Sequence, residues 1–334
     1  MIKRTLYFGN NAYLHTKDKQ LLVEFADKDK PQATVPIEDI GVVILDAYQL
    51  TISQKLITNL LHNNVALITC DERHMPQGLL LNLEGNTLQQ ERFNSQINVS
   101  LPLKKNLWQQ TIKAKIRNQS ALLSKLSGNT MSKKHNYSEN GFQNMLYWEQ
   151  SVRSGDPDNY EGRAAAFYWK NIFSDNDAGN VLESSAVDYK KPNIKNFKRG
   201  RFESAPNNLF NYGYAILRAI VARSLVASGL LPTLGIHHHN KYNAYALADD
   251  IMEPYRPYVD EIVFSLVEKY YSEEWEQDGF ELTPEIKKEL LKIATVDVSI
   301  ADTKSPLMNA VQRTTTSLNE CYMGNSRTLL YPTF

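Results

Sequence analysis

The chain has 334 residues, of which 42% are apolar, and its 37 basic and 37 acidic residues give a formal net charge of zero. This balance excludes a uniformly basic nucleic-acid-binding coat, although a local basic track is compatible with it. No stretch approaches the roughly 20 consecutive apolar residues that span a bilayer. The N-terminus lacks the apolar run and cleavage site of a signal peptide. We therefore expect a cytoplasmic protein whose two cysteines, Cys70 and Cys321, are reduced.

Short β-rich segments separated by Gly, Asn and Asp clusters fill the first ninety residues. This pattern predicts hairpins. A run with helical spacing over residues 51–63 interrupts them. Strands are expected at residues 5–8, 12–16, 20–25, 39–45, 65–70 and 78–83. The sequence thus predicts an N-terminal β-rich domain over residues 1–93.

From about residue 94 the apolar residues recur at helical intervals. The expected helices cover residues 103–127, 141–154, 161–174, 208–228, 249–271 and 284–294. Thr283 is an N-cap candidate for the last of these, with Pro284 at its first position. The predicted fold class is α+β, with the small β-rich domain followed by a larger all-helical domain over residues 94–334 and a boundary near residues 84–100.

The first segment with chemical interest contains Tyr160-Glu161-Gly162. Asp158 or Asn159 can cap a helix that begins near Tyr160, and the helix dipole favours an acidic residue such as Glu161 in the first turn. Capping alone is therefore a sufficient explanation of this carboxylate. The neighbouring glycine could instead leave room for a bulky ligand.

The second segment holds three consecutive histidines, His237, His238 and His239. Adjacent residues do not share one face of a helix or strand, so three ligands to one ion are not expected. One imidazole can bind a metal while its neighbours contact backbone, DNA phosphate or solvent. Taken alone, the run is better explained as a polar loop.

The third segment is acidic and runs from Leu247 to Pro257. On a helix, Asp250 and Glu253 are three residues apart and Asp249 and Glu253 are four apart, so either pair can share one side. Such carboxylates repel one another unless a cation or an arginine lies between them. Arg256 could be that arginine. Together with a histidine, however, these oxygens form a ligand set that suits Mg²⁺ or Mn²⁺.

In this order and at these separations, the segments resemble the CRISPR-associated integrase family that captures new spacers, in the form found beside single-effector CRISPR nucleases. The resemblance extends over nearly the whole chain. One departure is that many members have an Asp-Pro pair where this chain has Ser204-Ala205-Pro206. The matching pieces are Tyr160-Glu161-Gly162, Asn207 with Asn211-Tyr212-Gly213-Tyr214, Gly235-Ile236-His237-His238, and residues 247–257.

The resemblance implies a β-sandwich-like N-terminal domain, a helical C-terminal domain, a homodimer and a small ferredoxin-like partner subunit. It implies a catalytic site in which Glu161, His238 and Glu253 bind Mg²⁺ or Mn²⁺, and Asp250 fits a neighbouring acidic position that some members use. The implied activity is that of a metal-dependent DNA endonuclease and integrase, in which a 3′-hydroxyl attacks a phosphodiester. Whether His238 binds the metal or carries a proton is left open by the sequence.

Two groups of basic residues are candidates for contacts with double-stranded DNA. The first lies in a segment whose Pro and Gly predict a loop, and a solvated charged loop is an equal alternative for it. The second is the basic face of the expected helix 103–127. The first group comprises Lys190, Lys191, Lys195, Lys198, Arg199 and Arg201, and the second comprises Lys113, Lys115 and Arg117.

Two other functions use the same residues. One is a metal-dependent DNA-repair nuclease that does not integrate. The other is a catalytically silent DNA-binding subunit, in which the acidic cluster is only a network of ion pairs.

Overall fold

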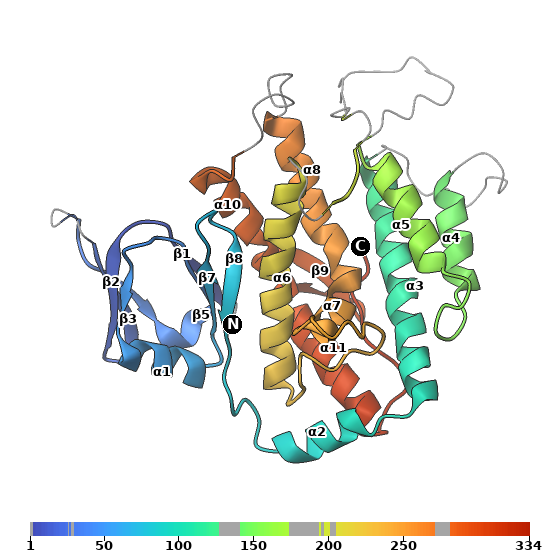
Figure 1. The fold of residues 1–334 in the computed structure, drawn as a ribbon, viewed down its shortest axis with the longest axis horizontal. Coiled ribbons are helices and arrows are strands. Elements are labelled where there is room, and N and C mark those ends of the chain that lie inside the picture. The colour runs from blue at the N-terminus through green and yellow to red at the C-terminus, as the bar shows by residue number, and fades with distance from the viewer. Residues whose placement is uncertain are drawn as a thin grey trace.

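The computed structural model describes residues 3–25, 27, 30–126, 141–173, 194, 197–200, 205–270 and 281–334. Its N-terminal part contains two four-stranded sheets, a 3₁₀ turn at Ile37–Asp39 and one α-helix, drawn in shades of blue in Figure 1. The first sheet has the order β1 (Arg4–Phe8), β5 (Ile40–Leu45), β7 (Ala66–Cys70) and β8 (Pro76–Leu80). The second has the order β4 (Ala33–Pro36), β3 (Gln20–Phe25), β2 (Ala12–Lys17) and β6 (Thr51–Ile52). Helix α1 (Gln54–His62) lies between β6 and β7 in the chain.

The first sheet is buried on both faces, which explains the unbroken apolar run of β5. Successive side chains of a strand point to opposite faces of its sheet. Val42 and Ile44 accordingly pack into the core of the helical part, whereas Val43 packs into the core between the two sheets. One sheet therefore serves both halves of the molecule.

The helical part is built around α6, which contacts β7 and β8 on one side and α7, α8 and α11 on others (Figure 1). Its apolar residues, among them Leu209, Leu217 and Ile220, are fully buried. The helices of the described residues are α2 (Gln89–Ile97), α3 (Leu101–Leu126), α4 (Gly141–Ser151), α5 (Tyr160–Asn171), α6 (Asn207–Ala227), α7 (Ala246–Met252), α8 (Arg256–Tyr270), α10 (Pro284–Leu290) and α11 (Leu307–Tyr322).

The α+β class is confirmed, but the prediction that residues 94–334 are all-helical is wrong. Strands β9 (Asp297–Ile300) and β10 (Thr303–Pro306) pair antiparallel. Ala301 and Asp302 join them with positive φ angles of 45° and 58°, the geometry of tight two-residue hairpins. Residue 93, where the two predicted domains meet, lies within α2, whose Arg92 donates to the carbonyl of Ser228 at 2.8 Å. Strands give way to helices between β8 and α2, and the division into two domains stays a prediction.

The single helix expected over residues 249–271 is also a wrong prediction. Glu253–Tyr255 form a 3₁₀ turn between α7 and α8, because Pro254 cannot donate to the helical ladder. Both cysteines are free. None of the helices in the described ranges is long and apolar enough to cross a membrane.

A buried ion pair joins the two parts. The Asp46 carboxylate, which follows β5, lies 2.7 Å from the Nζ of Lys287 on α10. It also accepts hydrogen bonds from Tyr7 at 2.6 Å and pairs with His74 at 2.8 Å. Burial alone would raise the pKa of Asp46, but its contacts with Lys287, Tyr7 and His74 outweigh burial and hold the pKa below the usual value.

We expect Lys287→Met to lower the free energy of unfolding by about 3–5 kcal/mol at pH 7, because it leaves a buried carboxylate without its cation. The loss should shrink as the pH falls from 7 through about 4, the ordinary range of a carboxyl group. The depressed pKa of Asp46 makes wild-type stability fall with acid, whereas in the variant burial favours the protonated form.

The measurement is urea unfolding over a pH series, with Lys292→Met as the control. Lys292 forms an exposed pair with Glu289, and exposed pairs contribute at most about 1 kcal/mol. An equal loss in both variants, or one that does not change with pH, would contradict the expectation.

Candidate metal-binding site

Glu161 lies in the first turn of α5, and two polar side chains fix this helix end. Asn159, with φ of 53°, accepts a hydrogen bond from the backbone N–H of Gly162 at 3.1 Å. Asp156 accepts from the N–H groups of Tyr160 and Glu161, both at 2.9 Å. The capping role expected of Asn159 is confirmed. A Cβ at position 162 would lie 2.7 Å from the Asn159 amide, so this glycine makes room for the cap, and the ligand suggested for that space is not needed to explain it.

The histidine loop is organised by Asp250, whose side chain is fully buried. One carboxylate oxygen accepts from the N–H groups of Ile236 at 2.6 Å and His237 at 2.9 Å. The other pairs with Nδ1 of His238. A Cβ on Gly235 would meet the carbonyl oxygen of His238 at 2.4 Å, so the loop can close over Asp250 only with glycine there. Both oxygens are engaged in this way, so Asp250 orients the loop, and its role as a metal ligand stays a prediction.

His238 is thereby held in one orientation. Its hydrogen bond to Asp250 raises the pKa of the imidazole, although burial opposes the shift. Because Nδ1 is taken, Nε2 is the ring nitrogen left for other chemistry, which is the usual arrangement of metal-binding histidines. Trp108 of α3 lies edge-on to this ring at 5.7 Å and stacks on His237 at 4.2 Å with an interplanar angle of 3°.

Glu253 occupies the 3₁₀ turn that follows α7 and is buried. Its Oε1 lies 3.0 Å from the guanidinium of Arg256. Asn118 of α3 fixes the turn by donating to the carbonyl of Pro254 at 2.7 Å. Burial would raise the pKa of Glu253, but Arg256 and Lys115 outweigh burial and lower it. The carboxylate is therefore held in its charged form.

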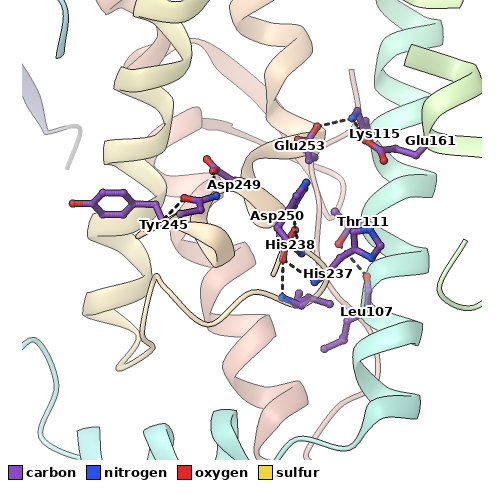
Figure 2. A network of polar contacts seen from close by, with 12 residues as sticks. Leu107, Thr111, Lys115, Glu161, His237, His238, Tyr245, Asp249, Asp250 and Glu253 are labelled. Carbon is purple, nitrogen blue, oxygen red and sulfur yellow. Dashed lines mark hydrogen bonds and ion pairs between the residues drawn. The ribbon is translucent and has the colours of Figure 1, made fainter. Parts of the chain in front are cut away.

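Lys115 of α3 lies between the two glutamates (Figure 2). Its Nζ is 2.6 Å from Oε1 of Glu161 and 2.7 Å from Oε2 of Glu253. The expectation that Lys115 belongs to an exposed basic face is wrong, because its side chain is only 8% exposed. Its sequence position gave a usable signal: Lys115 follows Ile112 by three residues and precedes Gln119 by four, which places it on the buried side of the helix.

These residues fit a divalent cation. The ammonium group of Lys115 stands where a cation bridging the two carboxylates would lie. Oε2 of Glu253 is buried and accepts no well-oriented hydrogen bond. Two carboxylates with an imidazole form a donor set suited to Mg²⁺ or Mn²⁺. As the side chains stand, no group of three or more His, Cys, Asp or Glu residues in the described part of the chain is gathered closely enough to hold an ion.

The other predicted residues lie apart from this cluster. Asp249 turns away from Glu253 and pairs with Arg218 at 2.6 Å. Arg117 pairs with Glu149 at 2.6 Å on the surface. Lys113 is half-buried on α3 and Lys198 is exposed, so both remain DNA-binding predictions. Lys190, Lys191, Lys195 and Arg201 lie outside the described residues.

Arg199 was expected to contact DNA, and the structure gives it a different partner set. Its guanidinium donates to Asn207 at 3.0 Å and to Asn211 at 2.7 Å. It also lies 5.7 Å from the ring centroid of Trp169 and 5.3 Å from that of Tyr214. Arg199 thus ties its segment to α5 and α6, and its contact with DNA stays a prediction.

A pair of converging carboxylates beside an oriented imidazole is the kind of site that supports metal-dependent phosphodiester chemistry. The chain matches the family model described as CRISPR associated protein Cas1 over residues 6–295. It is 34% identical over 300 residues to a CRISPR-associated endonuclease Cas1 from Neisseria meningitidis serogroup C (strain 8013), covering 90% of this chain and 86% of that protein. The protein belongs to the Cas1 family, as its sequence motifs indicated.

Two solved structures share its fold. A casposase bound to integration product superimposes with a TM-score of 0.71 at 19% identity, covering 98% of this chain and 92% of that one. A chain of a Cas6-RT-Cas1–Cas2 complex gives a TM-score of 0.68 at 17% identity, covering 100% of this chain and 36% of that one. The arrangement of sheets and helices is thus common to all three chains.

We expect Asp250→Asn to loosen the histidine loop, because an amide has one acceptor oxygen where the carboxylate has two. The free energy of unfolding should fall by about 1–3 kcal/mol, and amide hydrogen exchange should accelerate at Ile236 and His237. Asp249→Asn is the matched control, since it changes an adjacent buried carboxylate that pairs with Arg218 instead. Equal acceleration in both variants would show that Asp250 does not hold the loop.

Proposed function

We propose that this protein is a metal-dependent DNA endonuclease and integrase that inserts captured DNA fragments as new spacers into a CRISPR array. The observation that carries the proposal is the convergence of Glu161 and Glu253, 92 residues apart in the chain (253 − 161), on one cation-sized position. His238 of the same network is oriented by Asp250 (Figure 2). Relatives named as CRISPR-associated endonucleases and a casposase bound to integration product support the same reaction class.

Glu161 and Glu253 would hold Mg²⁺ or Mn²⁺, and Nε2 of His238 is the ring nitrogen available to bind it or to carry a proton. The bound cation supplies neutralisation of charge on the attacked phosphate and on the leaving 3′-oxygen. The residues position the phosphodiester for attack by the 3′-hydroxyl of a captured fragment. Water in place of that hydroxyl gives hydrolysis, so one site accounts for both endonuclease and integrase activity.

The substrates in this proposal are two double-stranded DNAs, the captured fragment and the CRISPR repeat. The proposed assembly is a homodimer with a small ferredoxin-like subunit, acting in the cytoplasm. Its support is the fold shared with a chain of a Cas6-RT-Cas1–Cas2 complex.

A catalytically silent DNA-binding subunit is the second candidate. It is favoured by the ion pairs that Glu253 forms with Lys115 and Arg256. Such a protein would show no Mn²⁺-dependent cleavage. A repair nuclease without integration would cleave DNA but would not join a fragment to a repeat-bearing target.

We expect Glu161→Ala, His238→Ala and Glu253→Ala each to lower strand transfer into a repeat-bearing duplex by at least about 100-fold, because each glutamate is a proposed ligand to the cation and His238 a proposed ligand or proton carrier. His237→Ala and His239→Ala should cost less. The measurement is joining of a labelled fragment, with circular dichroism to verify folding. Full activity in a well-folded variant would remove that residue from the site.

Activity should require Mg²⁺ or Mn²⁺ and should disappear in EDTA. Zn²⁺ should substitute poorly, since the donors are mainly oxygen and no thiolate takes part. Metal-depleted protein assayed with each ion in turn provides the measurement. Undiminished cleavage after thorough chelation would defeat the mechanism.

A further inference from the structure

Lys115 is the basic residue at the centre of the site, and it comes from a helix that contributes no carboxylate. The two oxygens of Glu253 face different cations, Oε1 the guanidinium of Arg256 and Oε2 the ammonium of Lys115. Glu161 hydrogen-bonds to the same ammonium. The two glutamates are therefore linked to each other through a single nitrogen atom.

The ammonium group of Lys115 offsets the repulsion between the two glutamates. Glu253 is almost completely buried, and two carboxylates that face one another in a place shielded from water repel strongly. Removing the charge between them would favour separation of the side chains. Lys115 thus keeps the pair together when no metal is bound.

The Nζ atom of Lys115 also occupies the position that a bridging metal ion would need. Its distances of 2.6 Å and 2.7 Å to the carboxylate oxygens are those of close ion pairs. Mg²⁺ binds carboxylate oxygens at about 2.0–2.1 Å. An ion that bridges both glutamates needs the space that the ammonium group fills, and the two positive charges repel at that distance.

Resting on the metal-dependent function proposed above, we propose that Lys115 is a positioning residue that holds Glu161 and Glu253 ready for the cation, and that Mg²⁺ or Mn²⁺ binds by displacing its ammonium group. The protein then keeps a preformed ligand pair at low metal concentration. The cost is a lower affinity for the ion, since binding must first break two ion pairs.

The first test is Mn²⁺ binding by calorimetry without DNA, in wild type, Lys115→Met and Lys115→Gln. Both variants remove the charge, and the glutamine keeps a hydrogen-bond donor for Glu161. We expect each to bind Mn²⁺ at least about tenfold more tightly than wild type, which corresponds to about 1.4 kcal/mol. In EDTA both should melt at a lower temperature than wild type, and Mn²⁺ should restore more stability to them.

Lys113→Met is the matched control, since it removes a lysine two residues away on α3 and should leave Mn²⁺ affinity unchanged. Unchanged or weaker Mn²⁺ binding in the folded Lys115 variants would overturn the inference. Weaker binding would mean that Lys115 is part of the scaffold that the metal needs.

The second test uses the wild-type protein, so it does not depend on a variant that folds. Lysine acylation read by mass spectrometry should label Lys115 slowly in EDTA, where the side chain is buried, and at least several-fold faster with Mn²⁺. Labelling of Lys113 is the internal standard. A Lys115 that stays equally protected in saturating Mn²⁺ would show that the ammonium is not displaced.

Glu253→Gln separates the two proposals. If this variant binds Mn²⁺ as well as wild type does, the metal site itself is wrong and the proposed function fails. If it loses Mn²⁺ binding while Lys115 labelling is unaffected by the ion in wild type, the metal site stands and only the displacement of Lys115 fails.

Discussion

The site depends on holding two carboxylates close together, one of them buried and the other partly exposed. Glu161 enters from the start of α5 and Glu253 from the 3₁₀ turn between α7 and α8. Their mutual repulsion must be balanced by positive charge, which Lys115 and Arg256 provide. The surrounding helix caps and turns fix the position of each charged group. The balance between negative and positive charge therefore does not rely on exposed side chains.

Helix α3 is the common support of this arrangement. Over three turns it supplies Trp108 against the histidine rings, Lys115 between the glutamates, and Asn118 to the turn that carries Glu253. Asn118 also donates to the carbonyl of Pro332 at 3.0 Å, which brings the C-terminal segment to the same helix. A residue near the end of the printed sequence is thus tied directly to the helix that carries Lys115.

Asp249, Asp250 and Glu253 show the limits of predicting side-chain contacts from spacing in the sequence. Spacing on an unbroken helix allowed either Asp249 or Asp250 to share one side with Glu253. In the structure each of the three has a different partner: Arg218 for Asp249, the histidine loop for Asp250, and Lys115 for Glu253. Pro254 indicates that the helix breaks there. Which partner each carboxylate finds depends on loops far away in the sequence, and local periodicity holds no information about them.

Much of the fold could be predicted because it follows from local pattern. The helix around Trp108 and the Asn159 cap were expected, as was the buried strand at Val42. The β9–β10 hairpin was missed because its four-residue strands are too short to show alternation. Of the site, the segments that carry Glu161, His238 and Glu253 were recognised by motif. Lys115 was assigned to a surface because its partners lie 46 and 138 residues away (161 − 115 and 253 − 115).

The sheet with two buried faces also limits how the molecule can move. Swinging the β-rich part away from the helices would expose Val42 and Ile44 to water and would separate Asp46 from Lys287. A hinge at this junction is therefore costly, and the β-rich part and the helical part move as one body. A contact made by the β-rich part would consequently fix the position of the helical part as well, without a flexible joint between the two.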